Sequence, residues 1–127
     1  HHAILSAEMA EKILEQYGFP REVIDKVRDA ILAHSFTLGY KPKTVEGMIL
    51  SDADKLDALG AVGIMRVFME SAYRGRTLDE AIHHFYEKLF KLKDLMWTRK
   101  GKELATRRHE YMINFLDRLE REIEGLE

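Results

Sequence analysis

Apolar residues recur every three or four positions along most of the chain, which is the spacing of one face of an α-helix. Proline occurs only at Pro20 and Pro42, so few positions interrupt a helix. The pattern therefore predicts an all-α fold of about six helices joined by short turns, without a sheet.

Two helices are predicted at the start of the chain. The first ends at Gly18, a residue suited to a left-handed helix end, and carries an apolar stripe of Ala3, Ala7, Ala10, Leu14 and Tyr17. Pro20 opens the second, in which one face holds Val23, Val27, Ile31 and His34. His34 is therefore expected to point inward near the end of its helix.

Further helices follow a loop at 35–43. Thr44 can cap a third helix that runs through 51–60, and Gly60 and Gly63 are expected to bracket its junction with a fourth. The fourth should bury Val62, Met65 and Met69. Thr77 and Glu80 have capping-box spacing for a fifth. A long last helix is expected after Gly101, with inward positions Leu104, Tyr111, Phe115 and Leu119.

Composition fits one helical domain over residues 1–127. The chain is 46% hydrophobic, and 20 basic against 22 acidic residues leave a net charge of −2, which favours neither nucleic acid nor membrane as a partner. The absence of cysteine excludes disulfides and thiolate metal sites. No apolar run approaches the roughly 20 residues of a membrane span, so a cytoplasmic protein is expected.

Three carboxylates lie within six residues of the third predicted helix. The helical spacing places Asp54 and Asp57 at the edge of the core, whereas Asp52 points elsewhere. A carboxylate in that position needs a partner, because burying an unpaired charge is costly. Metal binding supplies one; capping of a neighbouring helix, or pairing with Lys55 or Arg66, supplies another. The spacing does not decide between these interpretations.

Histidines are the other candidate ligands. An inward His34 close to a helix carrying Asp54 suits a divalent metal, although such a histidine is more often a core residue. His2 is a third candidate, but a His-His start is also typical of a purification tag. His83 and His84 are expected at the surface. The basic residues around Trp97, including Arg107 and Arg108, are most simply a solvated helix face.

The segments HHAILSAEMAEKIL, AILAHS and ILSDADKLDALGAVGIMRVF resemble, in that order, the second half of an HD-domain hydrolase. The resemblance implies an HD-type helical bundle with metal-dependent phosphohydrolase activity. Asp54, in Ala-Asp-Lys-Leu, matches the last metal-ligating aspartate of the family. His2 and His34 occupy the positions of two histidines that members with two metals add. The resemblance also lowers the weight of the tag interpretation.

One part of the family pattern is absent, because no histidine here is followed by aspartate. The defining His-Asp doublet and the histidine before it would precede His1. We therefore expect the domain to be N-terminally incomplete by about two helices of ordinary length. The alternative is a degenerate homologue that kept the fold and lost the chemistry.

The resemblance implies hydrolysis of a phosphomonoester or nucleotide by a metal-activated water. His2, His34 and Asp54 would hold one or two divalent ions, with Mn, Ni, Fe, Co, Zn or Mg as candidates. Lys55 and Asp57 are the candidate catalytic residues, and Arg66 would bind substrate. The alternatives are a di-iron oxygenase and a non-catalytic helical module that binds through the basic residues around Trp97. A homodimer is expected only by analogy.

Overall fold

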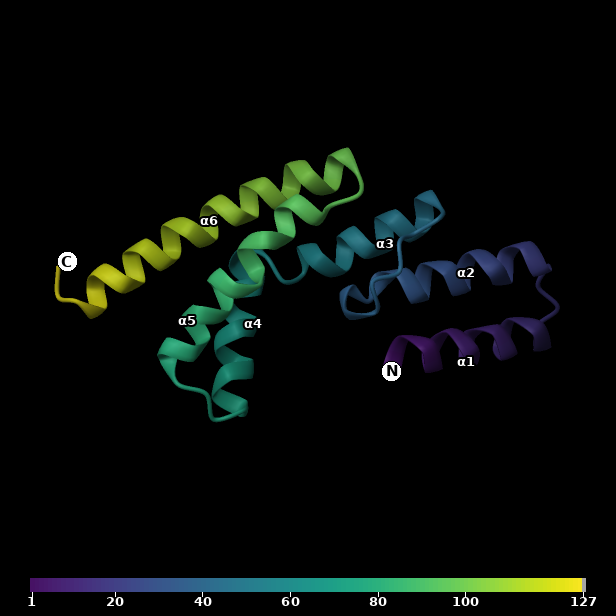
Figure 1. Ribbon diagram of the computed structural model, residues 1–127, viewed down its shortest axis with the longest axis horizontal. Coiled ribbons are helices and arrows are strands. Elements are labelled where there is room, and N and C mark those ends of the chain that lie inside the picture. The colour runs from purple at the N-terminus through teal and green to yellow at the C-terminus, as the bar shows by residue number, and fades with distance from the viewer. Residues whose placement is uncertain (127) are drawn as a thin grey trace. The chain divides into compact units, whose positions relative to one another are not determined.

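The computed structural model describes residues 1–126, which contain six α-helices and no strand (Figure 1). The helices are α1 (His2–Gln16), α2 (Arg21–His34), α3 (Val45–Leu56), α4 (Gly60–Tyr73), α5 (Leu78–Glu87) and α6 (Arg99–Ile123). Two 3-10 segments complete the fold, at Phe36–Leu38 and Leu89–Leu95. The prediction of an all-α fold with about six helices is confirmed.

The chain divides into two compact units, His1–Asp54 and Lys55–Glu127. In the first unit α1 and α2 form an antiparallel hairpin (Figure 1). Ala3 and Ala7 of α1 and Ile24 of α2 are almost fully buried, so small side chains allow the two helices to pack closely. Gly18 has a φ of 74°, as expected for the residue that ends α1.

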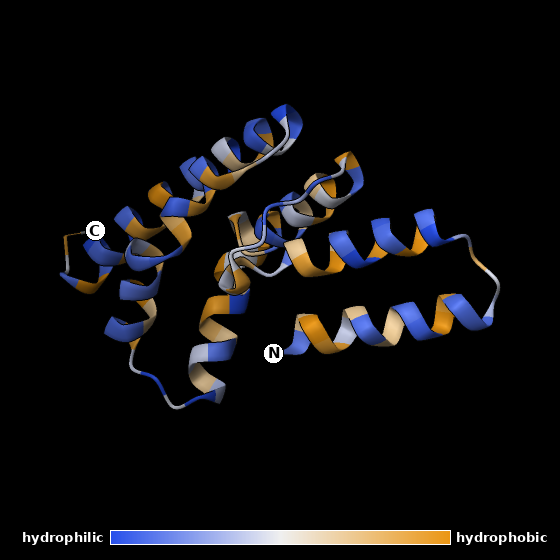
Figure 2. Cartoon of the chain, turned by 45° about the vertical axis from the view of Figure 1, so that its right-hand side comes forward, coloured by the Kyte–Doolittle hydropathy of each residue, from blue (hydrophilic) through white to orange (hydrophobic). Residues whose placement is uncertain are grey.

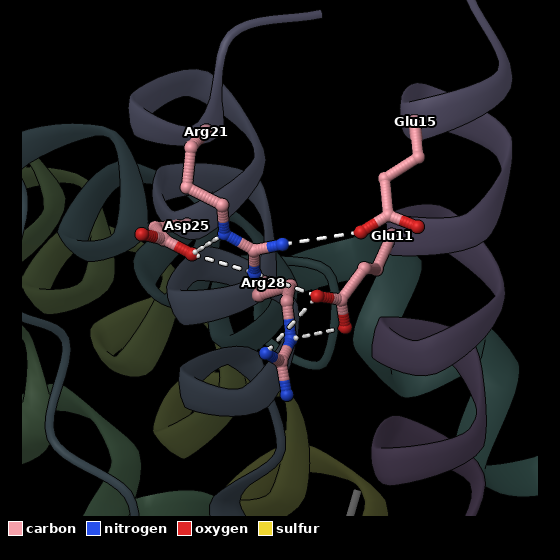
Figure 3. A network of polar contacts seen from close by, with 5 residues as sticks. All are labelled: Glu11, Glu15, Arg21, Asp25 and Arg28. Atoms are coloured by element: carbon pink, nitrogen blue, oxygen red, sulfur yellow. Dashed lines mark hydrogen bonds and ion pairs between the residues drawn. The ribbon is translucent and has the colours of Figure 1, made fainter.

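A network of ion pairs holds the α1–α2 hairpin on its polar side (Figure 3). Glu11 of α1 lies 2.6 Å from the guanidinium of Arg21 and 3.2 Å from Nε of Arg28, both on α2. Arg21 also contacts Glu15 and Asp25. These hydrogen bonds, first to Glu11 and then to Asp25, raise the pKa of Arg21 above its ordinary value. The network fixes the register of the two helices.

The second unit has its own apolar core around Phe85. Leu59, Leu89, Met112 and Leu116 pack with it, and all are at most 3% exposed. Phe68, Phe90 and Phe115 lie at the edge of this core, with ring centroids 6.0 to 6.2 Å from their neighbours. α4, α5 and α6 therefore bury one common cluster, and orange and blue positions alternate along each of them in Figure 2.

The predicted helix starts are confirmed at two caps. The Thr44 hydroxyl accepts from the Gly47 amide at 3.1 Å, and Thr77 and Glu80 form a reciprocal capping box at the start of α5. Three predicted boundaries are wrong. α3 ends at Leu56 rather than running to residue 60, and α6 begins at Arg99, so Gly101 is a buried residue inside it. Gly63 likewise lies within α4.

The predicted inner face of α4 is wrong, and that of α6 is confirmed only in part. Met65 and Met69 are more than half exposed, whereas Gly63, Ile64 and Ser71 are buried. On α6 the predicted Phe115 and Leu119 pack against the core, but Tyr111 is exposed. The buried residues of α6 are Gly101, Ala105, Met112 and Leu116. Close packing explains the burial of Gly63, Ser71 and Ala105, because small residues let neighbouring elements approach a helix that long side chains would hold away.

Candidate functional site

His2 and His34 are brought together by the α1–α2 hairpin. His2 is the first residue of α1 and His34 is the last of α2, so the antiparallel packing places both at the same end of the hairpin. Their ring centroids lie 5.7 Å apart, with the rings nearly perpendicular. This juxtaposition agrees with the expected pairing of the two histidines, although their role as metal ligands stays a prediction.

Hydrogen bonding orients His34. Its Nδ1 contacts the carbonyl oxygen of Ile31, one turn back along α2. In this contact Nδ1–H is the donor, so Nε2 carries the lone pair that a metal ligand needs. A backbone carbonyl that holds the second ring nitrogen is typical of metal-ligating histidines.

His1 has a different local role. Its Nδ1 accepts a hydrogen bond from the Ala3 amide at 3.4 Å, and its ring stacks on that of His2 with centroids 4.7 Å apart. The first residue therefore caps α1 and restricts the ring next to it. His1 contributes to positioning His2 rather than adding an independent ligand.

The carboxylates of α3 differ from the expected arrangement. Asp52 is 3% exposed, whereas Asp54 and Asp57 are exposed, so the predicted inner positions of Asp54 and Asp57 are wrong. Ser51 and Lys55 are buried beside Asp52, and Ile49 and Leu50 of the same helix are exposed. The inner face of α3 is thus polar. A prediction from apolar periodicity therefore takes the exposed face of this helix for the buried one.

Asp57 and Arg66 form an ion pair at the junction of α3 and α4. Both side chains are more than half exposed, and the Arg66 guanidinium also lies 3.5 Å from the Asp57 carbonyl oxygen. Pairing with Arg66 was one of the two interpretations left open for this carboxylate. Asp57 is therefore placed to orient the Arg66 guanidinium.

The α3–α4 turn is held by Arg108 of α6. Its guanidinium donates to the carbonyl oxygen of Leu56 at 2.5 Å, and the same oxygen accepts from the Leu59 amide at 3.1 Å. Gly60 begins α4 with a φ of 74°, and a Cβ built there would lie 2.9 Å from Cγ of Arg108. The glycine thus leaves room for the arginine side chain, and sequence reasoning had assigned Arg108 only to a solvated face.

The fit of the site to a divalent metal is partial. The two imidazoles are suitable donors in a suitable arrangement. Among residues 1–126, however, no three histidine, aspartate or glutamate side chains come close enough together to hold an ion. The described residues therefore bring two candidate ligands together, and the ligand role of Asp54 stays a prediction.

Comparisons with known proteins identify the family. The family model of the HD domain matches residues 1–59. A crystal structure of Bacillus subtilis YpgQ superposes with a TM-score of 0.82 at 38% identity, covering 95% of this chain and 67% of that one. The chain belongs to the HD-domain family. A predicted HD-superfamily hydrolase from an uncultured Thermotogales bacterium also matches, at 30% identity and a TM-score of 0.66, covering 96% of this chain and 55% of that chain.

The sequence of YpgQ from Bacillus subtilis (strain 168) is 42% identical over 119 residues. This match covers 87% of the chain and 58% of YpgQ, so the chain spans less than two thirds of that relative. YpgQ has also been crystallised in complex with ADP; that structure matches with a TM-score of 0.79 at 37% identity and covers 94% of this chain and 62% of that one. The HD-type helical fold predicted from the sequence is confirmed.

Two expectations about partners concern the surface. No helix within residues 1–126 is both long and apolar enough to cross a bilayer. The basic residues around Trp97 are partly neutralised, because Glu103 lies within 4.0 Å of both Arg99 and Lys100. Arg108 is turned toward Leu56. The basic face therefore offers less free positive charge than its sequence indicated.

Proposed function

We propose that this HD-family chain carries metal-binding and phosphate-binding residues of a metal-dependent phosphohydrolase that acts on a phosphomonoester or nucleotide. The observation that supports the proposal most directly is the convergence of His2 and His34 at one end of the α1–α2 hairpin. The relative YpgQ, crystallised with ADP, makes a nucleotide the first substrate to test.

His2 and His34 would hold a divalent ion, with Asp54 as a further ligand. When bound, such an ion polarises phosphoryl oxygens and lowers the pKa of a coordinated water. The contact between His34 Nδ1 and the Ile31 carbonyl would keep the imidazole in the ligating orientation. The Glu11 network, which fixes the register of α1 on α2, would hold the two histidines at their separation.

Lys55 and the Asp57–Arg66 pair would act on the phosphate. Arg66 would neutralise the charge that develops on the phosphoryl oxygens as the bond from water to phosphorus forms and the bond to the leaving oxygen breaks. Asp57 would orient the Arg66 guanidinium through their ion pair. Lys55, which is 7% exposed, would supply a second positive charge.

The test compares His34→Gln with His83→Gln. His83 is an exposed histidine of α5, 3.9 Å from Glu87, and serves as the matched control. With Mn²⁺, we expect His34→Gln to weaken binding of the ion, measured by calorimetry, by 10-fold or more. His83→Gln should leave it unchanged. Turnover of a nucleotide panel should follow the metal affinity.

Equal Mn²⁺ affinity in both variants would refute the ligand role of His34. Metal binding without phosphate release from any nucleotide or phosphomonoester would refute hydrolysis by this chain. Iron-dependent oxygen consumption would instead support the oxygenase alternative.

A further inference from the structure

A groove in the second unit is lined by cationic side chains, two of which form no ion pair with any described residue. It has a volume of about 710 Å³ and lies along α4 and the end of α5. Ligand sites in proteins commonly have volumes of roughly 300 to 1,000 Å³. The groove is therefore large enough for a molecule the size of a nucleotide.

Besides Arg66, two cations line the groove: Arg76, just before α5, and Lys88, just after it. Within the described part of the chain neither makes an ion pair, in contrast to Arg66 on α4 and Arg74, which follows the end of α4. His84 lies between them in sequence and lines the same groove. Burial lowers the pKa of His84, the charges of Lys88 and Arg76 lower it further, and the charge of Glu87 opposes this shift. Arg76 and Lys88 are thus close enough to the imidazole of His84 to change its pKa.

The one carboxylate that lines the groove does not cancel this charge. Glu70 is tied to Arg74 by an ion pair on the surface of α4. Arg66, at the other end, is paired with Asp57. The cations of the groove that form no ion pair are therefore Arg76 and Lys88, and together with His84 they offer three hydrogen-bond donors to a phosphate group.

The opposite lip of the groove is apolar and exposed. Met65, Met69 and Tyr73 lie on one face of α4, and Tyr73 is 89% exposed. Methionine side chains adapt to flat ligands, and a tyrosine ring stacks on them. A phosphate site beside such a lip has the chemistry of a site for a phosphate ester that also carries an apolar ring.

We infer that this groove binds a small organic phosphate of the nucleoside monophosphate class. The phosphate lies among Arg76, His84 and Lys88, and the ring lies on Met69 and Tyr73. The inference goes beyond the proposed function, because it requires neither a metal ion nor hydrolysis. Its residues belong to the second unit, whereas His2 and His34 belong to the first.

The experiment measures binding of AMP, adenosine and inorganic phosphate by calorimetry, with EDTA present to remove metals. We expect saturable binding of AMP, weaker binding of phosphate and weaker still of adenosine. The double variant Arg76→Gln/Lys88→Gln should weaken AMP binding by about 10-fold or more, because it removes two charge-assisted hydrogen bonds. Lys91→Gln, a matched exposed lysine that does not line the groove, should leave it unchanged.

Two further variants separate the parts of the proposal. Tyr73→Ser should weaken binding of AMP but not of phosphate. Because the Tyr73 side chain is exposed, this substitution should not unfold the protein, and weaker AMP binding would report the loss of the ring contact. His34→Gln should leave AMP binding in EDTA unchanged, even if it abolishes metal binding. Circular dichroism and thermal melting of each variant would check that the helices are retained.

Several results would overturn the inference. These are the absence of saturable AMP binding, equal affinity in the double variant and in Lys91→Gln, or loss of AMP binding in His34→Gln. Equal affinity for phosphate and AMP would overturn the role of the apolar lip. A change in melting temperature of Lys88→Gln without a change in AMP affinity would show that Lys88 only stabilises the end of α5.

Discussion

The addition of a single methyl group at Gly63 should strongly destabilise the fold. A Cβ at this residue would lie well under 3.0 Å from the carbonyl carbon and oxygen of Ala58, and real Cβ atoms essentially never come so close. Both atoms belong to the backbone, so no side chain can rotate away. In Gly63→Ala, the turn between α3 and α4 must shift as a whole.

The magnitude follows from two opposing effects. Alanine in place of glycine favours a helix by about 1 kcal/mol. Overpacking a tight contact costs about 1 to 3 kcal/mol, and more where backbone has to move. Here the shift would carry along Leu59, which is fully buried and accepts the Gly63 amide. We therefore expect a net loss of about 2 kcal/mol or more in the free energy of unfolding.

Urea denaturation, followed by far-ultraviolet circular dichroism, measures this loss. Gly47→Ala is the control, because Gly47 is also a helical glycine but its built Cβ meets only side-chain atoms, at 3.2 Å. That change should alter stability by about 1 kcal/mol at most. If Gly63→Ala were as stable as the native chain, the packing of the α3–α4 turn against α4 would be wrong.

Three further predictions concern stability. Glu11→Ala should lower the free energy of unfolding by about 1 to 2 kcal/mol, because it removes two ion pairs and leaves Arg28 without its acceptor. The accompanying fall in the urea midpoint should be smaller at 1 M salt. Thr77→Ala should cost about 1 kcal/mol through loss of the α5 cap, whereas Thr106→Ala, a control on α6, should cost less. Burial, and then the charge of Lys93, lowers the pKa of His109, so protonation favours the unfolded chain. Stability should therefore fall as the pH drops below 6.5, the ordinary histidine value, and His109→Gln should flatten that fall in urea midpoints measured from pH 7.5 to 5.

The sequence was a good guide where local chemistry decides the structure. The capping box at Thr77 and the left-handed Gly18 follow from hydrogen bonding and backbone freedom within a few residues, and both are confirmed. The proximity of His2 and His34 was anticipated from the family resemblance. It depends on two helices of nearly equal length that pack antiparallel.

The failures lie where packing decides. α3 buries Asp52 and Lys55 and exposes Ile49, the reverse of what apolar periodicity predicts. Periodicity identifies two faces of a helix but does not say which one meets its neighbours. The position of Arg108 was likewise beyond the sequence, because its partner, the Leu56 carbonyl, lies 52 residues away along the chain.

The contact between Arg108 and the Leu56 carbonyl links α6 to the candidate catalytic residues at the α3–α4 junction. Arg108 connects α6 to the turn where Asp57 and Arg66 form their ion pair. Because Gly60 has no side chain, it leaves room for Arg108 to reach the Leu56 carbonyl. A chain that ends before residue 108, or one in which a residue with a side chain replaces Gly60, would keep every candidate catalytic residue. It would lose the brace that sets the geometry of the Asp57–Arg66 pair. Variation in α6 could therefore tune a site with which this helix shares no candidate residue.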